Sequence, residues 1–312
     1  MSYLFLLLGF ILLIKGADWF VDGSSNIAKK LHVSPLIIGL TVVAFGTSTP
    51  EVAVSVSAAL SGSNAIAVGN VVGSNIFNLL MVGGICGAIA PLKVEPSILK
   101  KEFPFSILVV VIMLGLTLLG STNITTLTRI DGIILLLIFA AFMYFSVSTA
   151  MKQKKSATLE NVDSIKWSSN ILLSVIGVAS IIAGGELVVN SAVEIATAWG
   201  VSQTVIGLTI VAIGTSLPEL VTSVVASNKG ERDIAMGNII GSNLFNVLFV
   251  LGISASIHPI TVSIESIYDM ILLIGISIYA YVLSYTGKRI NRIEGISMVV
   301  VYVAYMAYIL IR

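Results

Sequence analysis

Two near-copies of one polar motif lie inside long apolar runs of this chain. The first copy is AFGTSTPEVAVS, from Ala44 to Ser55, and the second is AIGTSLPELVTS, from Ala212 to Ser223. In each copy a glutamate directly follows a proline: Glu51 follows Pro50 in the first. A carboxylate at bilayer depth is energetically costly and usually marks a functional site. Two such glutamates related by a repeat therefore form a candidate site.

The prolines predict that the backbone opens at these points. Because proline has no N–H, Pro50 leaves the carbonyl of Gly46 without its helical partner, and Pro218 does the same to Gly214. Glycine at those positions lowers the cost of unwinding the turn. Unpaired carbonyls in hydrocarbon are costly, so we expect the opened turns to line a cavity or to bind something.

The polar atoms that these turns offer are oxygens. Glu51 and Glu219 supply carboxylates, and the opened backbone supplies the carbonyls of residues 44–46 and 212–214. Oxygen ligands without sulfur or imidazole select hard cations such as Ca²⁺, Na⁺ or Mg²⁺. The nearby hydroxyls belong to Thr47, Ser48, Thr215 and Ser216.

A second motif follows each copy of the first. It reads GNVVGSNIFN at 69–78 and GNIIGSNLFN at 237–246. Its glycines allow close approach of helices. The serine and the last asparagine are four residues apart and share one helical face, so they can complete an oxygen shell. These pairs are Ser74 with Asn78 and Ser242 with Asn246. We expect Asn75 and Asn243 to point elsewhere, and Asn70 and Asn238 to cap or bridge helices.

The composition places these motifs in an all-α integral membrane protein. Hydrophobic residues make up 56% of the chain and charged residues 11%, whereas a soluble domain has about 25% charged residues. The formal net charge of +1 excludes a nucleic-acid binder with a strongly basic surface. Runs of spanning length predict ten transmembrane helices, at 3–24, 34–60, 65–90, 103–120, 128–148, 168–192, 202–226, 234–257, 266–285 and 291–311.

The basic residues predict the orientation of these helices. With the N-terminus outside, all but three of the 17 Lys and Arg residues lie in the loops that face the cytoplasm. The exceptions are Lys15, Arg129 and Arg312. Because basic loops stay on the cytoplasmic side, we expect the N-terminus and the C-terminus both outside.

An internal repeat organises the chain. Shifted by 168 residues, Gly39–Gly84 aligns without a gap on Gly207–Gly252, with 26 identities in 46 positions. Five predicted helices separate equivalent positions, and five is odd, so the second copy enters the membrane from the opposite side. This is the inverted repeat of secondary transporters, which bind substrate near the midplane. We expect a first repeat at 1–150, a cytoplasmic linker at 151–167 and a second repeat at 168–312.

The charge of the site predicts how it works. Two carboxylates give −2, which one Ca²⁺, two Na⁺ or two protons would neutralise. An empty cavity of that charge is costly in low dielectric, so exchange of one set of cations for another is the natural mode. The sequence therefore predicts an antiporter rather than an enzyme, with no cofactor beyond the transported ions.

GTSTPE and GTSLPE, each followed by a GNxxGSNxFN string, make the whole chain resemble the Ca²⁺/cation antiporter superfamily, and specifically the prokaryotic sodium/calcium exchangers. The resemblance implies exchange of Na⁺ for Ca²⁺ by alternating access, with the first and sixth helices sliding past a rigid core. It implies a diamond of four ion sites between the second, third, seventh and eighth helices. The matching metal ligands are Glu51, Glu219, Thr47, Thr215, Ser48, Ser216, Ser74, Ser242, Asn78 and Asn246, with the carbonyls of Ala44 and Ala212.

The partners expected from this interpretation are small inorganic cations and the lipid bilayer of the cell membrane, with the protein acting as a single chain. One departure concerns Asn246, where some relatives carry an aspartate. Asparagine removes one negative charge and one protonatable group, which leaves the sodium stoichiometry and any role of potassium open.

Rival interpretations remain at this stage. In an exchanger of protons for Ca²⁺ or another divalent cation, Glu51 and Glu219 would carry the protons, although that branch usually has a further carboxylate where this chain has Asn78 and Asn246. A channel would show flux that ignores a counter-ion gradient. Asp18 and Glu186, which the repeat aligns, are either gate acids or interfacial charges.

Overall fold

The chain is almost entirely helical in the computed structural model. The structure describes residues 1–119, 125–154, 166–201, 206, 209–210 and 212–311. The helical elements of the first half, where η marks a π-helical turn, are α1 (Ser2–Leu31), α2 (Pro35–Ile38), η1 (Gly39–Val43), α3 (Ala44–Thr47), α4 (Thr49–Leu60), α5 (Asn64–Phe77), η2 (Asn78–Val82), α6 (Gly83–Ile89), η3 (Ile98–Glu102), α7 (Phe103–Leu119) and α8 (Arg129–Lys154).

The second half repeats much of this order. Shifting the bounds of α4, α5, η2 and α6 by 168 residues gives those of four elements in the second half, α12, α13, η5 and α14. The sequence repeat is thus also a repeat of helix ends and π-helical turns. The described helical elements of this half are α9 (Trp167–Ala198), α11 (Ala212–Gly214), α12 (Leu217–Asn228), α13 (Arg232–Phe245), η5 (Asn246–Val250), α14 (Leu251–Ile257), α15 (Ile264–Gly287) and α16 (Arg292–Ile311).

The membrane-spanning helices can be counted only in the described part of the chain. There, 8 helices are long and apolar enough to cross a membrane, and a bent pair makes a ninth. The members of that pair, Pro35–Thr47 and Thr49–Leu60, meet at 50°. The predicted helix at 202–226 falls partly on positions outside the described residues, so the tenth span stays a prediction.

Three predicted helix ends were wrong, and one of them is that of α9, which ends at Ala198 instead of residue 192. α1 continues to Leu31 instead of ending at residue 24, because the polar segment after the apolar run is itself buried, including Ser24 and Ser25. It ends at His32, whose backbone is left-handed with φ 56°. α8 likewise continues through Lys154, into the predicted linker at 151–167, whose positions 155–165 lie outside the described residues.

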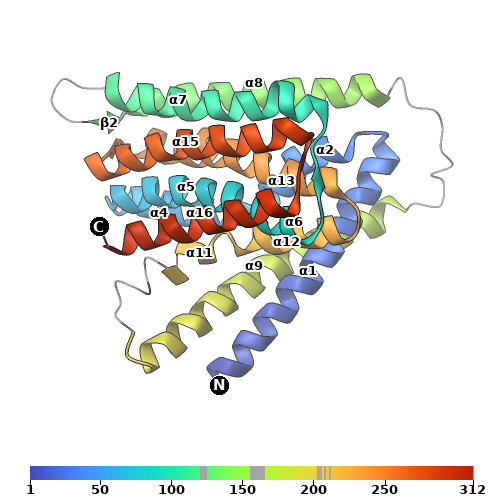
Figure 1. Cartoon of the computed structure of the whole chain (residues 1–312), viewed down its shortest axis with the longest axis horizontal. Helices are drawn as coiled ribbons and strands as arrows, with labels where there is room; N and C mark the ends of the chain where they lie inside the picture. Colours follow the sequence, from blue (N-terminus) through green and yellow to red (C-terminus); the bar gives the residue numbers. More distant parts are fainter. Residues whose placement is uncertain (120–124, 155–165, 202–205, 207–208, 211, 312) are drawn as a thin grey trace.

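α1 and α9 form a pair that crosses the other helices obliquely (Figure 1). Glycines line the contact between them. A Cβ atom added to Gly9 would lie 2.9 Å from the carbonyl oxygen of Gly184, and one added to Gly16 would lie 2.8 Å from that of Gly177. Since numbers rise along α1 as they fall along α9, the two equivalent helices run antiparallel. At these glycines the two backbones approach so closely that a side chain larger than hydrogen does not fit without a shift.

The helix that continues from α13 to Ile257 lies at the centre of the molecule. In its most apolar window 94% of the residues are buried, against 17% for the peripheral helix α16. The second GxxxG motif provides its close contacts: a Cβ atom on Gly237 would lie 2.6 Å from the carbonyl of Leu36, and one on Gly241 would lie 2.7 Å from that of Leu40. The predicted packing role of these two glycines is confirmed.

Four two-residue strands add to the predicted all-α fold. β1 (Leu92–Lys93) pairs antiparallel with β4 (Arg289–Ile290), and β2 (Thr126–Leu127) pairs with β3 (Ile260–Thr261). The pairing satisfies backbone N–H and C=O groups of the connecting segments. Each ladder joins a connection of the first half to one of the second half.

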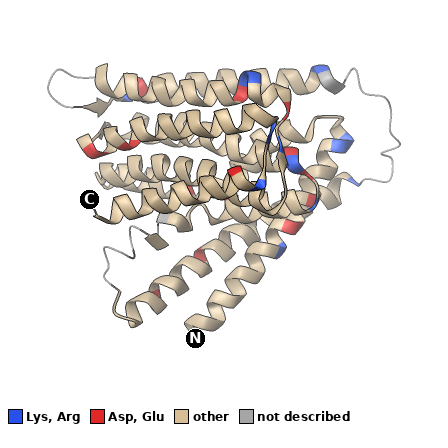
Figure 2. Cartoon of the chain, viewed as in Figure 1, with Lys and Arg blue, Asp and Glu red and all other residues tan. Residues whose placement is uncertain are grey.

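Most Lys and Arg residues gather at one end of the helix bundle (Figure 2). This end holds the connection between α12 and α13, and the basic residues predict that it faces the cytoplasm. The orientation in the membrane, and with it the side of the two termini, stays a prediction.

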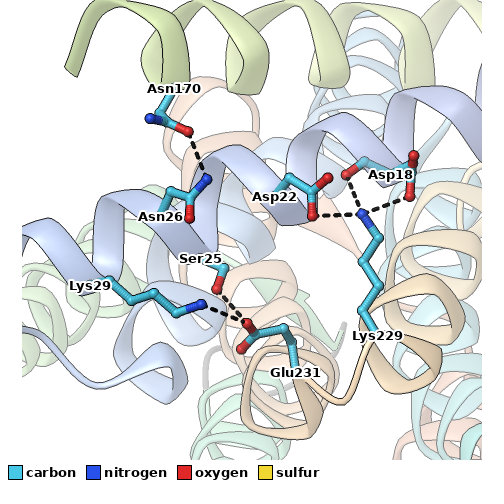
Figure 3. Close-up of polar contacts among 8 residues, drawn as sticks. All are labelled: Asp18, Asp22, Ser25, Asn26, Lys29, Asn170, Lys229 and Glu231. Carbon is cyan, nitrogen blue, oxygen red and sulfur yellow. Dashed lines mark hydrogen bonds and ion pairs between the residues drawn. The ribbon is translucent and has the colours of Figure 1, made fainter. Parts of the chain in front are cut away.

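The connection between α12 and α13 is tied to α1 at this end by ion pairs (Figure 3). The Lys229 Nζ atom lies 2.6 Å from an oxygen of Asp18 and 2.6 Å from an oxygen of Asp22. Partial burial acts to lower the pKa of Lys229, but the two carboxylates raise it above its usual value. The contact is therefore kept at neutral pH, and the lysine side of it is lost as the pH rises through that raised pKa. Asp18 thus forms an ion pair with the connection between α12 and α13.

A second contact strengthens this tie. Glu231 accepts a hydrogen bond of 2.5 Å from the Ser25 hydroxyl and lies 3.5 Å from the Lys29 ammonium (Figure 3). We call these contacts of Lys229 and Glu231 with α1 the Lys229 tether. The repeat places Ser61 and Ser63 where Lys229 and Glu231 stand, so the equivalent connection in the first half has no charge with which to form such a contact.

We expect Gly16→Ala to lower the stability of the fold by about 1–3 kcal/mol, because the added Cβ would press against the α9 backbone. The matched control is Gly115→Ala in α7, where no described atom lies within 4 Å of the added Cβ. There alanine should be neutral or stabilise by up to about 1 kcal/mol. Thermal unfolding of the detergent-solubilised variants measures both effects. Equal midpoints would contradict the tight contact.

Candidate functional site

Each polar motif breaks a helix at a serine. Ser48 separates α3 from α4 with φ/ψ of −82°/9°, and Ser216 precedes α12 with −95°/5°. Pro50 and Pro218 lie at the start of the following helices, where the missing N–H costs no helical hydrogen bond. The break predicted from the two prolines is confirmed in both copies.

Two of the three carbonyls at 44–46 keep a hydrogen-bond partner in the first opened turn. The Ala44 carbonyl accepts the backbone N–H of Ser48 at 3.0 Å and lies 3.4 Å from the Thr47 hydroxyl. The Phe45 carbonyl accepts the Thr49 hydroxyl at 3.1 Å. Helical bonding continues up to the break because only the N–H of the proline is missing. The carbonyl that Pro50 deprives of a helical N–H is that of Gly46, and the carbonyls of Ala44 and Phe45 would bind a cation through a second lone pair.

The two glutamates lie at the start of the helices that resume after the breaks. Glu51 is in the first turn of α4 and Glu219 is in the first turn of α12, and both side chains are completely buried. The partial positive charge of a helix N-terminus stabilises a carboxylate at that position. Each broken helix thus directs a favourable dipole at its own glutamate.

Hydroxyl groups of both repeats converge on the carboxylates. Ser216 of the second repeat donates to Glu51 Oε1 at 3.1 Å, and Ser48 of the first repeat donates to Glu219 Oε1 at 2.8 Å. Each carboxylate also receives the serine of its own repeat at 3.4 Å, Ser74 for Glu51 and Ser242 for Glu219. The two motifs therefore build one site, and neither repeat completes it alone.

Four oxygen atoms of this site are buried with no hydrogen-bond partner among the described residues. They are the Oε2 atoms of Glu51 and Glu219 and the Oδ1 atoms of Asn78 and Asn246. A buried acceptor without a partner is rare, and a buried carboxylate requires a counter-charge or a proton. This donor set consists of oxygen and suits a hard cation.

Asn70 bridges the broken helix to its neighbours. Its Nδ2 atom donates to the Ser55 hydroxyl at 2.9 Å and to the Glu51 carbonyl at 3.3 Å. Its Oδ1 atom accepts the hydroxyl of Thr215, from the other repeat, at 3.2 Å. The predicted role of this asparagine as a helix bridge is confirmed.

Asn238 makes the equivalent contacts in the second repeat. Its Nδ2 atom donates to Ser223 at 3.0 Å and to the Glu219 carbonyl at 3.4 Å, and its Oδ1 atom accepts the Thr47 hydroxyl at 3.1 Å. Sequence reasoning missed the two serines in these bridges, Ser55 and Ser223. A signal was available, since each follows its glutamate by four residues in both copies.

Asn75 and Asn243 face each other where α5 crosses α13. The Asn75 side chain donates to the backbone carbonyl of Asn243 at 3.2 Å, and the Asn243 side chain donates to that of Asn75 at 3.4 Å. These reciprocal bonds join the two repeats beside the carboxylates. The two side chains thus connect the repeats. This agrees with the prediction that they point away from the oxygen shell of the cation site.

Comparison with known proteins shows similarity along almost the whole chain. A model of the family described as sodium/calcium exchanger protein matches residues 1–148 and 169–311. The protein CaxA of Alkalimonas amylolytica is 40% identical over 313 residues, covering 97% of this chain and 96% of CaxA. The sodium/calcium exchanger MaX1 of Methanosarcina acetivorans is 32% identical over 340 residues, covering 98% and 97%.

The fold is also similar to a solved structure. The sodium–calcium exchanger NCX_Mj superposes with a TM-score of 0.85 at 32% sequence identity, covering 99% of this chain and 98% of that one. The resemblance drawn from the two motifs is therefore confirmed.

We expect Glu51→Gln to raise the unfolding temperature of the protein in buffer free of Na⁺ and Ca²⁺, because it removes one of two buried carboxylates. It should also abolish the stabilisation that added Ca²⁺ gives to the wild-type protein through mass action. Thermal unfolding in detergent, with choline as the background cation, measures both effects. The control is Glu186→Gln, at an exposed glutamate of α9, which should leave the Ca²⁺ response intact. A full Ca²⁺ response in Glu51→Gln would exclude this glutamate from the site.

Proposed function

Since this chain belongs to the sodium/calcium exchanger protein family, we propose that it exchanges Na⁺ for Ca²⁺ across the cell membrane. Membership of the family makes it a multi-pass membrane transporter of cations and not an enzyme. The proposal concerns the identity of the exchanged ions, the residues that bind them and the movement that carries them across.

The observation that carries the proposal is the pair of buried glutamates with unpartnered oxygens. Glu51 and Glu219 lie in one site, each bound by a serine of the opposite repeat. One Ca²⁺ or two Na⁺ neutralise the two carboxylates equally well. Because the site without cations is costly, release of one set is favoured when the other replaces it, which supports obligatory exchange.

The proposed ligands come from both repeats and lie in the four predicted helices at 34–60, 65–90, 202–226 and 234–257. The carboxylates, together with Asn78 and Asn246, supply the unpartnered oxygens. The serine hydroxyls of the motifs donate their protons to the two glutamates, so their oxygen lone pairs can bind a cation. The remaining proposed ligands are Thr47, Thr215, Ser48, Ser216, Ser74 and Ser242, with the carbonyls of Ala44 and Ala212.

The proposed membrane arrangement has ten helices in two inverted repeats, at 1–150 and 168–312, with both termini outside. The gathering of Lys and Arg at one end of the bundle supports this orientation. The antiparallel course of α1 and α9 supports the inversion of one repeat relative to the other. The contacts within the site are complete in one chain, so we propose that a single chain transports the ions.

Alternating access is proposed to occur by sliding of α1 and α9 as a pair along the remaining helices. Their seam of glycines keeps the two together while their other contacts change. The Lys229 tether fastens α1 to the connection between α12 and α13, so its ion pairs have to break when α1 moves. The uncharged equivalent in the first half cannot form the same contact in the opposite state.

The alternative is exchange of protons for Ca²⁺ or another divalent cation, in which two protons would neutralise Glu51 and Glu219 in place of Na⁺. The neutral side chains of Asn78 and Asn246 argue against a further proton carrier in the site. A direct comparison of the two driving gradients separates the proposals.

Purified protein in liposomes should take up radioactive Ca²⁺ when an outward Na⁺ gradient is imposed, and should show no uptake with an outward proton gradient and no Na⁺. Uptake with the proton gradient alone would replace the proposal by its alternative. Uptake that needs neither gradient would indicate a channel. Glu51→Gln and Glu219→Gln should each reduce uptake to the level of empty liposomes, because each removes one of the two charges that hold the cations.

We expect Lys229→Gln to raise the maximal rate of exchange several-fold at low ionic strength, since α1 no longer has to break the two ion pairs of Lys229 before it moves, and only the longer Lys29–Glu231 pair remains. Added salt should raise the wild-type rate by screening the same pairs and should have less effect on the variant. Lys288→Gln, at an exposed lysine in another connection, is the control and should behave as wild type. An unchanged or lower rate in Lys229→Gln would exclude the tether as a barrier to transport.

A further inference from the structure

Asn246 is held by one of its two amide atoms. Its Nδ2 atom donates a hydrogen bond of 3.1 Å to the side-chain oxygen of Asn75, while its own Oδ1 atom is buried without a partner among the described residues. Both side chains are completely buried. The bond crosses between the repeats, since the two residues are 171 positions apart.

The chemistry of the next contact decides the orientation of both amides. Asn75 donates its Nδ2 atom to the backbone carbonyl of Asn243 at 3.2 Å. A carbonyl can only accept, so the amide nitrogen of Asn75 has to face it and the amide oxygen has to face Asn246. Asn246 then has to turn its nitrogen toward Asn75 and its oxygen away from it. One backbone carbonyl thus determines which atom Asn246 presents to the site.

The repeat provides an internal comparison, because the equivalent asparagine is not held in this way. Asn243, the equivalent of Asn75, donates to the backbone carbonyl of Asn75 at 3.4 Å. Within the described part of the chain its Oδ1 atom has no partner, and neither amide atom of Asn78, the equivalent of Asn246, has one. The two proposed ligand asparagines therefore differ: the amide of Asn246 is held by a hydrogen bond to the other repeat, and that of Asn78 has no such bond to a described residue.

We propose that Asn75 is a positioning residue that directs the side-chain oxygen of Asn246, and not its nitrogen, toward the transported cation. The inference rests on the function proposed above. A turned amide would present two N–H donors to a cation and repel it. Fixing the amide beforehand removes the ordering cost from cation binding, which raises affinity without adding a contact. Asn75 acts only through Asn246 and does not touch the ion itself.

The test compares Asn75→Ala with Asn243→Ala in Na⁺-driven Ca²⁺ uptake. Both variants lose one cross-repeat bond to a backbone carbonyl, but only the first releases a ligand asparagine. We expect Asn75→Ala to raise the KM for Ca²⁺ roughly tenfold, as for removal of an outer partner of a metal ligand, with little change in maximal rate. Asn243→Ala should change the KM less than about twofold. Equal changes in the two variants would overturn the proposal.

A second background tests orientation directly. In Asn246→Asp both terminal atoms are oxygens, so turning the group changes nothing, and Asn75→Ala should not raise the KM further. A further rise of similar size would overturn the proposal, because it would show that Asn75 acts by another route. Should Asn75→Ala not be recovered folded, Asn75→Ser replaces it in each comparison, since its shorter side chain cannot reach Asn246.

Failure of the positioning role can be distinguished from failure of the proposed function. If Glu51→Gln is inactive while Asn75→Ala and Asn243→Ala have equal KM values, only the positioning role fails. If Glu51→Gln exchanges Ca²⁺ as wild type does, the site itself is misplaced and the positioning role fails with it.

Discussion

The burial of two carboxylates where no water reaches them is the constraint on which the rest of this molecule depends. Glu51 and Glu219 are completely enclosed, and their charges require compensation that an apolar interior cannot supply. The helix breaks place both glutamates at helix N-termini, and serines donate to one oxygen of each. One oxygen of each carboxylate is left without a partner among the described residues. The protein thus compensates the negative charge of the site only in part. A bound cation compensates the rest, and it can be released again.

The two repeats solve this problem together. Equivalent residues bind across the repeats. Ser48 donates to Glu219 and Ser216 donates to Glu51. Likewise, Thr47 donates to Asn238 and Thr215 donates to Asn70. Departures from the symmetry are informative for the same reason. Lys229 ties α1 to the connection between α12 and α13, and Asn75 holds Asn246, whereas among the described residues Asn243 makes no such bond to Asn78. A symmetric site gives two similar states, and these few asymmetric contacts are what can make one of them preferred.

The sequence predicted the parts of the site that are written in local chemistry. A proline two residues after a serine, a glutamate directly after that proline and a period of 168 residues sufficed to predict the breaks, the carboxylates and the duplication. It did not predict contacts across the repeats, because bonds such as Asn246 to Asn75 depend on how two helices cross. It also missed the length of α1, whose polar end is buried by neighbours that are remote in sequence. Local composition cannot report that burial.

The reciprocal bonds between serine and glutamate have a consequence for biosynthesis. While only the first half of the chain has left the ribosome, Glu51 lacks Ser216 and has only the weaker contact with Ser74, 3.4 Å away, within its own half. The same half also lacks the helix that crosses α5 at Asn75. Its carboxylate therefore has to stay protonated, or remain near the aqueous boundary, until the second half is inserted. The ion site is then completed only when the fold is completed. A truncated chain differs from a finished one because its Glu51 lies in the membrane without the serine of the second half.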